Sequence, residues 1–254
     1  MDRQTSQGGH VTGKVLVFAA TYNERDNIQK LCETVLGLNT DYDMLVVDDN
    51  SPDGTGQLLD SLAKGEPRLS VVHRAGKLGV GSAHKVAMHY AIEKGYETLV
   101  TMDADFSHPP EDIPRLLENL AGADFVTGSR YVKGGSCDYT GYRIVVSVLA
   151  NWGARLLLGI PLHEVTTSFR AFRVAFLRKV DLDSIQAHGY SYFMEAVFRL
   201  YCAGGRLKEI PFHFVDRTAG ASKIPRFEII NGVLQLLRLA AGRLYGAKRA
   251  PGRD

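Results

Sequence analysis

Runs of apolar residues alternate with amphipathic stretches along the first half of the chain. Five short runs are almost free of polar residues and read as strands buried on both faces: 14–20, 42–49, 69–74, 97–103 and 123–130. The segments between them predict helices, and in the first of these the apolar residues recur at helical spacing: Ile28, Leu31, Cys32, Val35 and Leu36. Strands of this kind, separated by helices, are typical of a mostly parallel sheet covered by helices. The pattern therefore predicts an α/β fold.

The alternation weakens beyond residue 131. Helices are predicted at 141–158, 192–202 and 227–245, and a strand at 207–215. We therefore divide the chain into three parts. A polar, glycine-rich tail over 1–13 is expected to be disordered, an α/β domain covers 14–224, and an amphipathic basic helix and tail follow over 225–254.

Charge is distributed unevenly along the 254 residues, although the net charge is only +2. From Arg217 onward there are eight Lys or Arg residues and two acidic ones, so this end is locally basic. Such a tail either binds an anionic partner (phosphate, lipid headgroup or nucleic acid) or is simply a solvated helix end. The three cysteines have no metal-ligand spacing and no disulfide framework, which favours a reducing, cytosolic setting.

Polar residues follow the apolar runs at the predicted strand ends. The four clusters are Thr21–Glu24; Asp48, Asp49 and Ser51; Asp103 and Asp105; and Ser129 and Arg130. Any one cluster could be an ordinary turn or helix cap. Because ligands of open α/β sheets bind beyond the carboxyl ends of the strands, four clusters at four strand ends predict a binding site there.

Asp103 and Asp105 repel each other unless a cation or shared proton lies between them. Mg²⁺ and Mn²⁺ favour oxygen ligands, and two carboxylates suit a site completed by a diphosphate. The neighbouring His108 is expected to cap a helix or support the pair rather than bind metal. The chain has no P-loop motif, and 76–83 lacks the G-x-G-x-x-G spacing, so a P-loop ATPase and a Rossmann-type oxidoreductase are disfavoured.

Five motifs occur in order at these strand ends: TYNERDN, VVDDNSPDGT, KLGVGSA, MDADFSHPPE and TGSRY. Further along are RIVVSVLANWGARLLLG, VTTSFRAFR, GYSYFMEAVFR and IPFHFVDRTAGASK. Over residues 15–223 the chain resembles the inverting GT-A glycosyltransferases of family 2, and within them the dolichol- or polyprenol-phosphate mannose synthases. The resemblance implies a GT-A catalytic domain over 14–224 and a transferase activity.

The resemblance also implies roles for individual residues of the donor site. The nucleotide base and ribose would be held by Tyr22, Glu24, Val47 and Asp49. The nucleotide sugar would be bound by Asp103, Ala104 and Asp105, with Arg130 also contacting the donor. Asp105 would be the main ligand of Mg²⁺ or Mn²⁺, helped by Asp103. Ser107 stands where relatives often have Gln, so it would ligate directly or through a water.

Two further groups of residues follow from the same resemblance. Arg217 and Lys223 would grip the donor diphosphate, and Arg143, with Ser147 nearby, would receive the phosphate of a lipid acceptor. The implied donor is GDP-mannose and the implied acceptor a polyprenyl or dolichyl monophosphate, giving a β-mannosyl phosphate by inversion. A UDP-sugar donor such as UDP-glucose remains an alternative. Nucleic acid is disfavoured as a partner, because the carboxylate clusters would repel a phosphate backbone.

A lipid acceptor implies an approach to a membrane surface. Apolar residues of the last predicted helix recur near helical spacing between Phe227 and Tyr245, with arginines and lysines as the basic complement. This is typical of an interfacial helix on anionic lipid, and equally of a helix packed on the protein's own body. The apolar segment 144–162 contains Asn151 and Arg155, so it does not predict a transmembrane span, and Trp152 within it is expected in the core or at an interface. We expect a peripheral enzyme on the cytosolic face of a membrane, or one held there by a membrane-anchoring partner protein.

Overall fold

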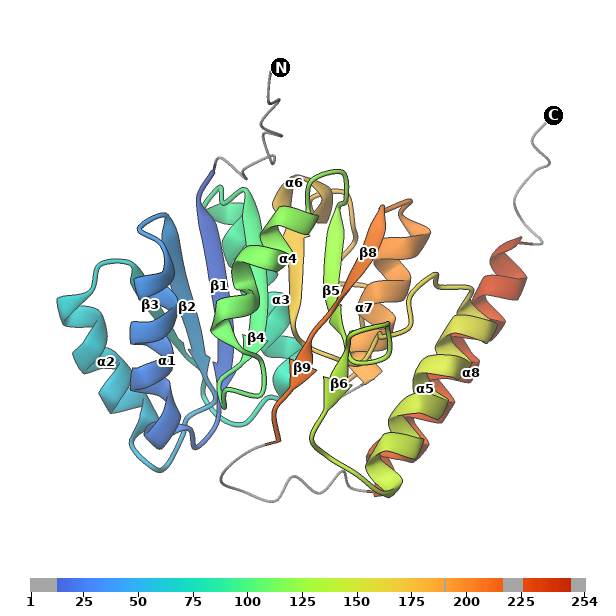
Figure 1. Ribbon diagram of the computed structural model, residues 1–254, viewed down its shortest axis with the longest axis horizontal. Coiled ribbons are helices and arrows are strands. Elements are labelled where there is room, and N and C mark those ends of the chain that lie inside the picture. The colour runs from blue at the N-terminus through green and yellow to red at the C-terminus, as the bar shows by residue number, and fades with distance from the viewer. Residues whose placement is uncertain (1–12, 190, 217–225, 248–254) are drawn as a thin grey trace, which may run out of the picture.

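A seven-stranded sheet with helices on both faces forms the body of the protein (Figure 1). The computed structural model describes residues 13–189, 191–216 and 226–247. The strands of this sheet are β1 (Val15–Thr21), β2 (Tyr42–Asp48), β3 (Leu69–His73), β4 (Thr98–Asp103), β5 (Phe125–Ser129), β7 (Arg170–Arg173) and β8 (Leu207–Pro211). The helices are α1 (Arg25–Leu38), α2 (Thr55–Gly65), α3 (Val80–Glu93), α4 (Ile113–Asn119), α5 (Tyr142–Leu158), α6 (Val174–Leu177), α7 (Ser191–Cys202) and α8 (Arg226–Ala247), with a 3₁₀ turn, η1 (Pro110–Asp112), before α4.

The sheet order is β3-β2-β1-β4-β7-β5-β8. All neighbouring strands are parallel except β7, which runs antiparallel to β4 on one side and β5 on the other. The predicted mostly parallel α/β sheet is thus confirmed. The sequence pattern did not predict β7, because a four-residue strand with arginine at both ends has no recognisable alternation.

Alternate residues of the central strands enter two separate core layers. On β1, Leu16 and Phe18 pack with residues of α3, α6 and α7, whereas Val15 and Val17 pack with residues of α1, α2 and α4. Both layers are apolar, which explains why these strands read as continuous apolar runs. The five apolar positions predicted for the first helix are all buried on α1.

The register brings the polar strand ends to one edge of the sheet. Ala20 of β1 pairs with Asp103 of β4, and Thr21 of β1 pairs with Asp48 of β2. Residues that follow β1, β2 and β4 therefore emerge beside one another, at the lower edge in Figure 1.

The predicted strand at 207–215 is divided in two. β8 ends at Pro211, and β9 (His213–Phe214) leaves the main sheet to pair in parallel with β6 (Ser136–Cys137). Between them, the Phe212 N–H donates to the Ser129 carbonyl at 3.2 Å, and its side chain is buried. This division places β6 and β9 below β5 and β8 in Figure 1, near the start of α5.

Helices α5 and α8 lie side by side beyond β8 (Figure 1). One side of the pair packs on the body: Ala154 and Leu158 of α5 and Leu239 of α8 are buried, and Gln235 of α8 donates to Glu195 of α7 at 2.9 Å. The other side is exposed and apolar. This α5–α8 surface consists of Tyr142, Val145, Val148, Leu149, Trp152, Leu156, Leu157, Ile230, Val233, Leu234 and Leu237.

Helix α8 packs on the body, as one of the two alternatives expects, and it also exposes apolar side chains. Its binding to anionic lipid stays a prediction. Of the two places expected for Trp152, the core is wrong, because its side chain is 62% exposed on α5, and an interface stays a prediction. Within the described residues, none of the helices combines the length and apolar character needed to cross a membrane.

Candidate active site

A cavity of about 560 Å³ opens at the carboxyl edge of the sheet. Its lining includes eight of the residues singled out in the sequence: Tyr22, Glu24, Asp49, Asp103, Ala104, Asp105, Arg130 and Arg143. Ser147 also lines it, beside residues of α5, α7 and α8. The structure thus brings together, in one space, side chains as far apart in the sequence as Tyr22 and Leu236.

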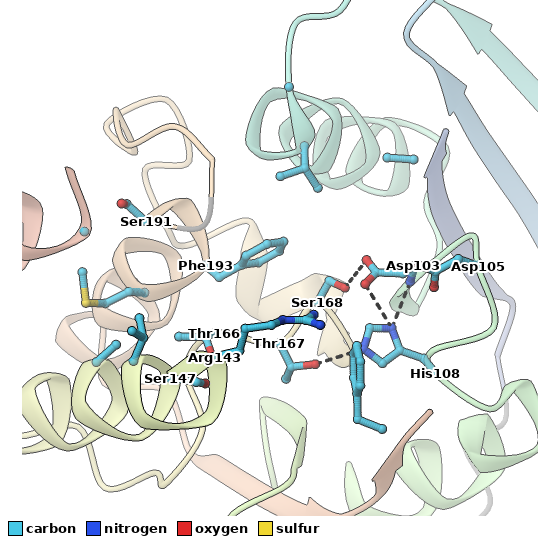
Figure 2. A pocket seen from close by; sticks show the side chains of 18 of the residues that line it. Asp103, Asp105, His108, Arg143, Ser147, Thr166, Thr167, Ser168, Ser191 and Phe193 are labelled. Carbon is cyan, nitrogen blue, oxygen red and sulfur yellow. Dashed lines mark hydrogen bonds and ion pairs between the residues drawn. The ribbon is translucent and has the colours of Figure 1, made fainter. Parts of the chain in front are cut away.

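Asp103 and Asp105 are held in place by hydroxyl and backbone donors, and Figure 2 shows the bond from Ser168 to Asp103. Asp103 is the last residue of β4, and its Oδ1 accepts a hydrogen bond of 2.5 Å from the Ser168 hydroxyl. Oδ1 of Asp105 accepts a 3.0 Å bond from the Ser107 N–H and another from the Ser107 hydroxyl. Phe106, which lies between Asp105 and Ser107 in the chain, has a φ of 61°, a left-handed conformation that is unusual for a bulky residue. Such a residue at the turn indicates backbone strain at the point where both carboxylates are presented.

His108 supports this turn from below. Its Nδ1 accepts a 3.0 Å hydrogen bond from the Asp103 N–H, so the ring proton is on Nε2, which lies 3.2 Å from the Thr167 hydroxyl (Figure 2). The ring is fully buried and stacks on Phe169 at 5.2 Å. Burial lowers the pKa of His108, which keeps the imidazole neutral. The side chain lines the cavity with both ring nitrogens bonded to the protein, and it connects the end of β4 to the loop before β7.

The donor set fits a divalent cation only if a substrate completes the coordination. Asp103 and Asp105 both line the cavity, but no group of three or more His, Cys, Asp or Glu side chains that could hold a metal occurs within the described ranges. Two carboxylates are what Mg²⁺ typically takes from a protein when diphosphate oxygens and water supply the other ligands. Ser107 lies behind Asp105, buried and bonded to it, so in this geometry it orients the carboxylate.

Asp49 holds the loop that leads into α3. Its Oδ2 accepts a 3.1 Å bond from the Gly79 N–H, and Oδ1 pairs with the Arg74 guanidinium. Gly79 has a φ of 87°, which favours glycine at this entry to the helix. Asp49 therefore borders the cavity and also fixes the shape of the 74–79 loop.

Tyr22 and Lys77 form the far wall of the cavity. The Lys77 ammonium lies 4.0 Å from the centre of the Tyr22 ring. Tyr22 is partly exposed, which leaves an aromatic surface at the position where the resemblance places a nucleotide base.

Four residues of the implied site are not among those that line the described cavity, and one of them is Ser107, which bonds to Asp105. The Val47 side chain is fully buried in the core layer that faces α3, so only its backbone could take part in binding. Arg217 and Lys223 lie outside the described residues.

The end of the cavity near α5 carries two arginines. The Arg143 guanidinium lies 4.8 Å from the centre of the Tyr139 ring and 3.7 Å from Asp216. Arg130, which follows β5, is almost buried and pairs with the fully buried Glu164 at 2.7 Å. Although burial alone lowers the pKa of Arg130, the charge of Glu164 raises it overall, so this arginine is permanently charged.

Several supporting residues had no role assigned from the sequence. Glu164, Thr166, Thr167 and Ser168 come from the loop before β7, and all bond to residues that line the cavity or to one another. In the sequence these residues belong to the motif VTTSFRAFR or directly precede it. Its three consecutive hydroxyls before a strand were a signal, but their partners are determined by the insertion of β7 between β4 and β5.

Comparison with known proteins agrees with this geometry. Residues 16–181 match the model of the family described as Glycosyl transferase family 2. The chain is a family 2 glycosyl transferase. It is 41% identical over 216 residues to a polyprenol monophosphomannose synthase of Mycolicibacterium smegmatis, covering 84% of this chain and 82% of that protein. It is 37% identical over 238 residues to an undecaprenyl-phosphate mannosyltransferase of Micrococcus luteus, covering 93% and 98%.

The fold of this family 2 glycosyl transferase is also found in a solved structure. A glucosyl-3-phosphoglycerate synthase of Mycobacterium tuberculosis, in complex with Mn²⁺, UDP and glucosyl-3-phosphoglycerate, superposes with a TM-score of 0.66. The identity is 18%, with 91% of this chain and 81% of that chain covered. The GT-A fold implied by the sequence motifs is therefore confirmed.

Proposed function

We propose that this enzyme transfers mannose from GDP-mannose to a polyprenyl monophosphate, with inversion at the anomeric carbon, to give polyprenyl phosphate β-mannose. The names of the two relatives, a polyprenol monophosphomannose synthase and an undecaprenyl-phosphate mannosyltransferase, support both the sugar and the acceptor class.

One observation carries the proposal: a single cavity has an acidic end and an apolar wall. Asp103 and Asp105 lie at one end, and Val146, Leu149 and Val233 of α5 and α8 line another part. A nucleotide sugar with its cation suits the acidic end. An isoprenoid chain suits the apolar wall, since such a chain gains free energy by leaving water. A water-soluble acceptor would not need that wall.

The proposed reaction is a single displacement. An oxygen of the acceptor phosphate forms a bond to C1 of mannose, while the bond from C1 to the β-phosphate oxygen of GDP-mannose breaks and its electron pair leaves with GDP. A phosphate monoester has a second pKa of about 6, so near neutral pH it is already an anionic nucleophile and needs no general base. The residues of the chain then act by binding and orientation.

Asp103 and Asp105 would hold a divalent cation against the donor diphosphate, with Asp105 as the main ligand. When bound, that cation would offset the negative charge that develops on the leaving GDP. Arg143 and Ser147 line the cavity at the α5 end and are proposed to align the acceptor phosphate, because alignment of two reactants can supply several kcal/mol of the barrier. Arg217 and Lys223 are proposed to bind the diphosphate, and Tyr22, Glu24 and Asp49 the nucleoside.

A membrane surface is the proposed location of this reaction. Leu149 and Val233 belong both to the α5–α8 surface and to the cavity lining, so the cavity opens where exposed apolar side chains gather. Helix α5 contains no acidic residue, and Arg155, Arg238 and Arg243 are exposed on the two helices. Apolar side chains with a basic complement suit an anionic lipid surface on the cytosolic side of a membrane. Anchoring by a partner protein stays a prediction.

A UDP-sugar is the alternative donor. Labelled mannose transfer from GDP-mannose to a short-chain polyprenyl phosphate, in detergent with Mn²⁺ or Mg²⁺, tests the whole reaction. Thermal shift with GDP-mannose, UDP-glucose and NAD, each with and without the metal, separates the donors. Metal-dependent stabilisation by GDP-mannose alone is expected. If the enzyme transfers sugar from UDP-glucose but not from GDP-mannose, the donor in the proposal is a UDP-sugar. Transfer from neither would overturn the proposal.

A further inference from the structure

Glu164 is a fully buried carboxylate that takes no direct part in the reaction proposed above, yet it lies directly behind the acceptor end of the cavity. Its two oxygens accept hydrogen bonds of 2.7 Å from Nε and Nη2 of Arg130 in a bidentate pair. The Thr166 hydroxyl also donates to it. Burial alone raises the pKa of Glu164, but the charge and hydrogen bonds of Arg130 outweigh burial, so its pKa lies below the usual range and the pair is ionic.

Each of the three guanidinium nitrogens of Arg130 has a protein partner in this arrangement. Beyond the two bonds to Glu164, Nη2 lies 3.1 Å from the Thr166 hydroxyl, and Nη1 donates to the Tyr139 hydroxyl. Arg130 lines the cavity, and apart from Glu164 its hydrogen-bond partners line the cavity too. Contact of Arg130 with the donor stays a prediction of the resemblance, and the positive charge of Arg130 is offset by Glu164.

The same network reaches both residues proposed to receive the acceptor phosphate. The ring of Tyr139 lies beneath the Arg143 guanidinium at 4.8 Å, and Nη2 of Arg130 lies 3.4 Å from the Ser147 hydroxyl. Figure 2 shows Arg143 reaching from α5 into the cavity, with Ser147 and Thr166 close to it. Ser147 also accepts a 2.7 Å bond from the Tyr131 hydroxyl.

Asn151 fastens α5 to the loop that carries Glu164. Its side-chain amide donates to the Ser147 carbonyl at 2.9 Å and lies 3.4 Å from Glu164, while its oxygen accepts a 2.7 Å bond from the Val165 N–H. The first half of α5, with Arg143 and Ser147, is therefore tied through Asn151 and Arg130 to one carboxylate.

We propose that Glu164 is a positioning residue for the acceptor phosphate: by fixing and neutralising Arg130 it sets the places of Tyr139 and Ser147, and leaves Arg143 as the arginine presented to the phosphate. This inference rests on the proposed function for the identity of the acceptor. A buried charge pair of this kind contributes orientation more than net stability.

The test substitutes Glu164→Gln in the full chain, which keeps the shape and removes the charge. We expect the KM for a short-chain polyprenyl phosphate to rise about tenfold to a hundredfold, because small displacements of binding groups have effects of this size. The KM for GDP-mannose should stay within about twofold, since Asp103, Asp105 and Tyr22 lie outside the network. Tyr139→Phe removes only the hydroxyl that Arg130 contacts, and should give a smaller change with the same selectivity if the Glu164 variant fails to fold.

A matched control lies at the opposite end of the same strand. Asp124, just before β5, forms a bidentate pair with Arg206 at 2.9 and 3.0 Å, and neither residue lines the cavity. Asp124→Asn breaks a carboxylate–arginine pair of the same bidentate geometry, in which Arg206 is 63% exposed, and should leave both KM values near those of the wild-type enzyme.

Direct binding separates this inference from the proposed reaction. Titration calorimetry of the short-chain polyprenyl phosphate without donor should show the same loss of affinity in Glu164→Gln. If the wild-type protein binds the lipid phosphate but does not use GDP-mannose, the proposed reaction fails and the binding comparison still tests the inference. Three results would overturn the positioning role of Glu164. They are equal changes in the KM values of both substrates, tighter binding of the lipid phosphate by Glu164→Gln, and no binding of it by the wild-type protein.

Discussion

The hydroxyl of Ser168 donates a 2.5 Å hydrogen bond to Oδ1 of Asp103, although 65 residues separate them in the chain. The bond exists because β7 lies antiparallel beside β4, with Arg170 opposite Thr101. The Thr101 hydroxyl donates in turn to the Ser168 carbonyl, also at 2.5 Å. The loop before β7 is thus fixed against the strand end that presents the acidic pair.

Ser168→Ala should weaken the response of the enzyme to its divalent cation. Without the hydroxyl, Asp103 loses the donor that orients it, and loss of such a supporting bond typically costs about tenfold to a hundredfold in metal affinity. The measurement is the Mn²⁺ concentration that gives half-maximal transfer. Ser61→Ala, on the exposed side of α2, is the control and should not change it. An unchanged Mn²⁺ requirement in Ser168→Ala would contradict the supporting role.

Asp105→Ala should reduce transfer by at least about a hundredfold while leaving the fold intact. The expected size is that of removing one electrostatic contact to the developing charge. Activity with labelled GDP-mannose and a melting curve by circular dichroism check both parts. Asp112→Asn, in the 3₁₀ turn that follows, removes a carboxylate outside the cavity lining and serves as the control. Substantial turnover by Asp105→Ala would contradict the proposed role of Asp105 as a metal ligand.

Because of His84, the free energy of unfolding should decrease as the pH falls below about 6.5. The imidazole is fully buried on α3, between Phe18 and Phe193, and burial lowers its pKa to about 3. Between these two values the unfolded chain binds a proton that the folded chain does not, so stability decreases as pH falls. From pH 7 to pH 5 this amounts to about 2 kcal/mol in the free energy of unfolding.

Urea unfolding of His84→Leu at pH 7 and pH 5 checks that the pH dependence of stability comes from His84. The variant should lose most of that 2 kcal/mol difference, because no buried imidazole remains to be protonated. His89→Leu, which removes an exposed histidine of the same helix and keeps His84, should retain the difference. The assignment fails if His84→Leu and the wild-type protein show the same dependence on pH.

Trp152 should enter the lipid interface when the protein binds vesicles. It is the single tryptophan of the chain and is exposed on α5, so its fluorescence reports on that helix alone. Vesicles that contain anionic phospholipid should shift its emission to shorter wavelength and allow quenching by brominated lipid. Trp152→Ser should lower vesicle affinity in a sedimentation assay by about tenfold, the size expected for losing one large apolar side chain from an interface.

Leu78 provides the control for this surface. It is 59% exposed but lies outside α5 and α8, so Leu78→Ser removes a comparable amount of apolar surface elsewhere. Its vesicle affinity should equal that of the wild-type protein. Equal losses in Leu78→Ser and Trp152→Ser would show that the α5–α8 surface has no special part in membrane binding.

The α/β layers and the place of the site could be predicted from the sequence, because both depend on local features. Continuous apolar runs such as Val15–Thr21 determine strands that are buried on both faces, and helical spacing at Ile28 and Leu31 determines the buried side of α1. Polar residues directly after these runs, Asp103 and Asp105 above all, must emerge at the carboxyl edge of a parallel sheet.

Only the tertiary structure decided which side chains support and surround that site. The insertion of β7 between β4 and β5 brings Ser168 to Asp103 and Glu164 to Arg130, and no local pattern specifies a contact between residues so far apart. The same holds for Trp152. Its neighbours in the sequence are apolar, and that pattern is compatible with either a buried or an exposed helix. Only the packing of α5 against α8 and the body determines that Trp152 faces outward. Local periodicity is encoded by adjacent residues, whereas pairing and exposure depend on how separate elements pack together.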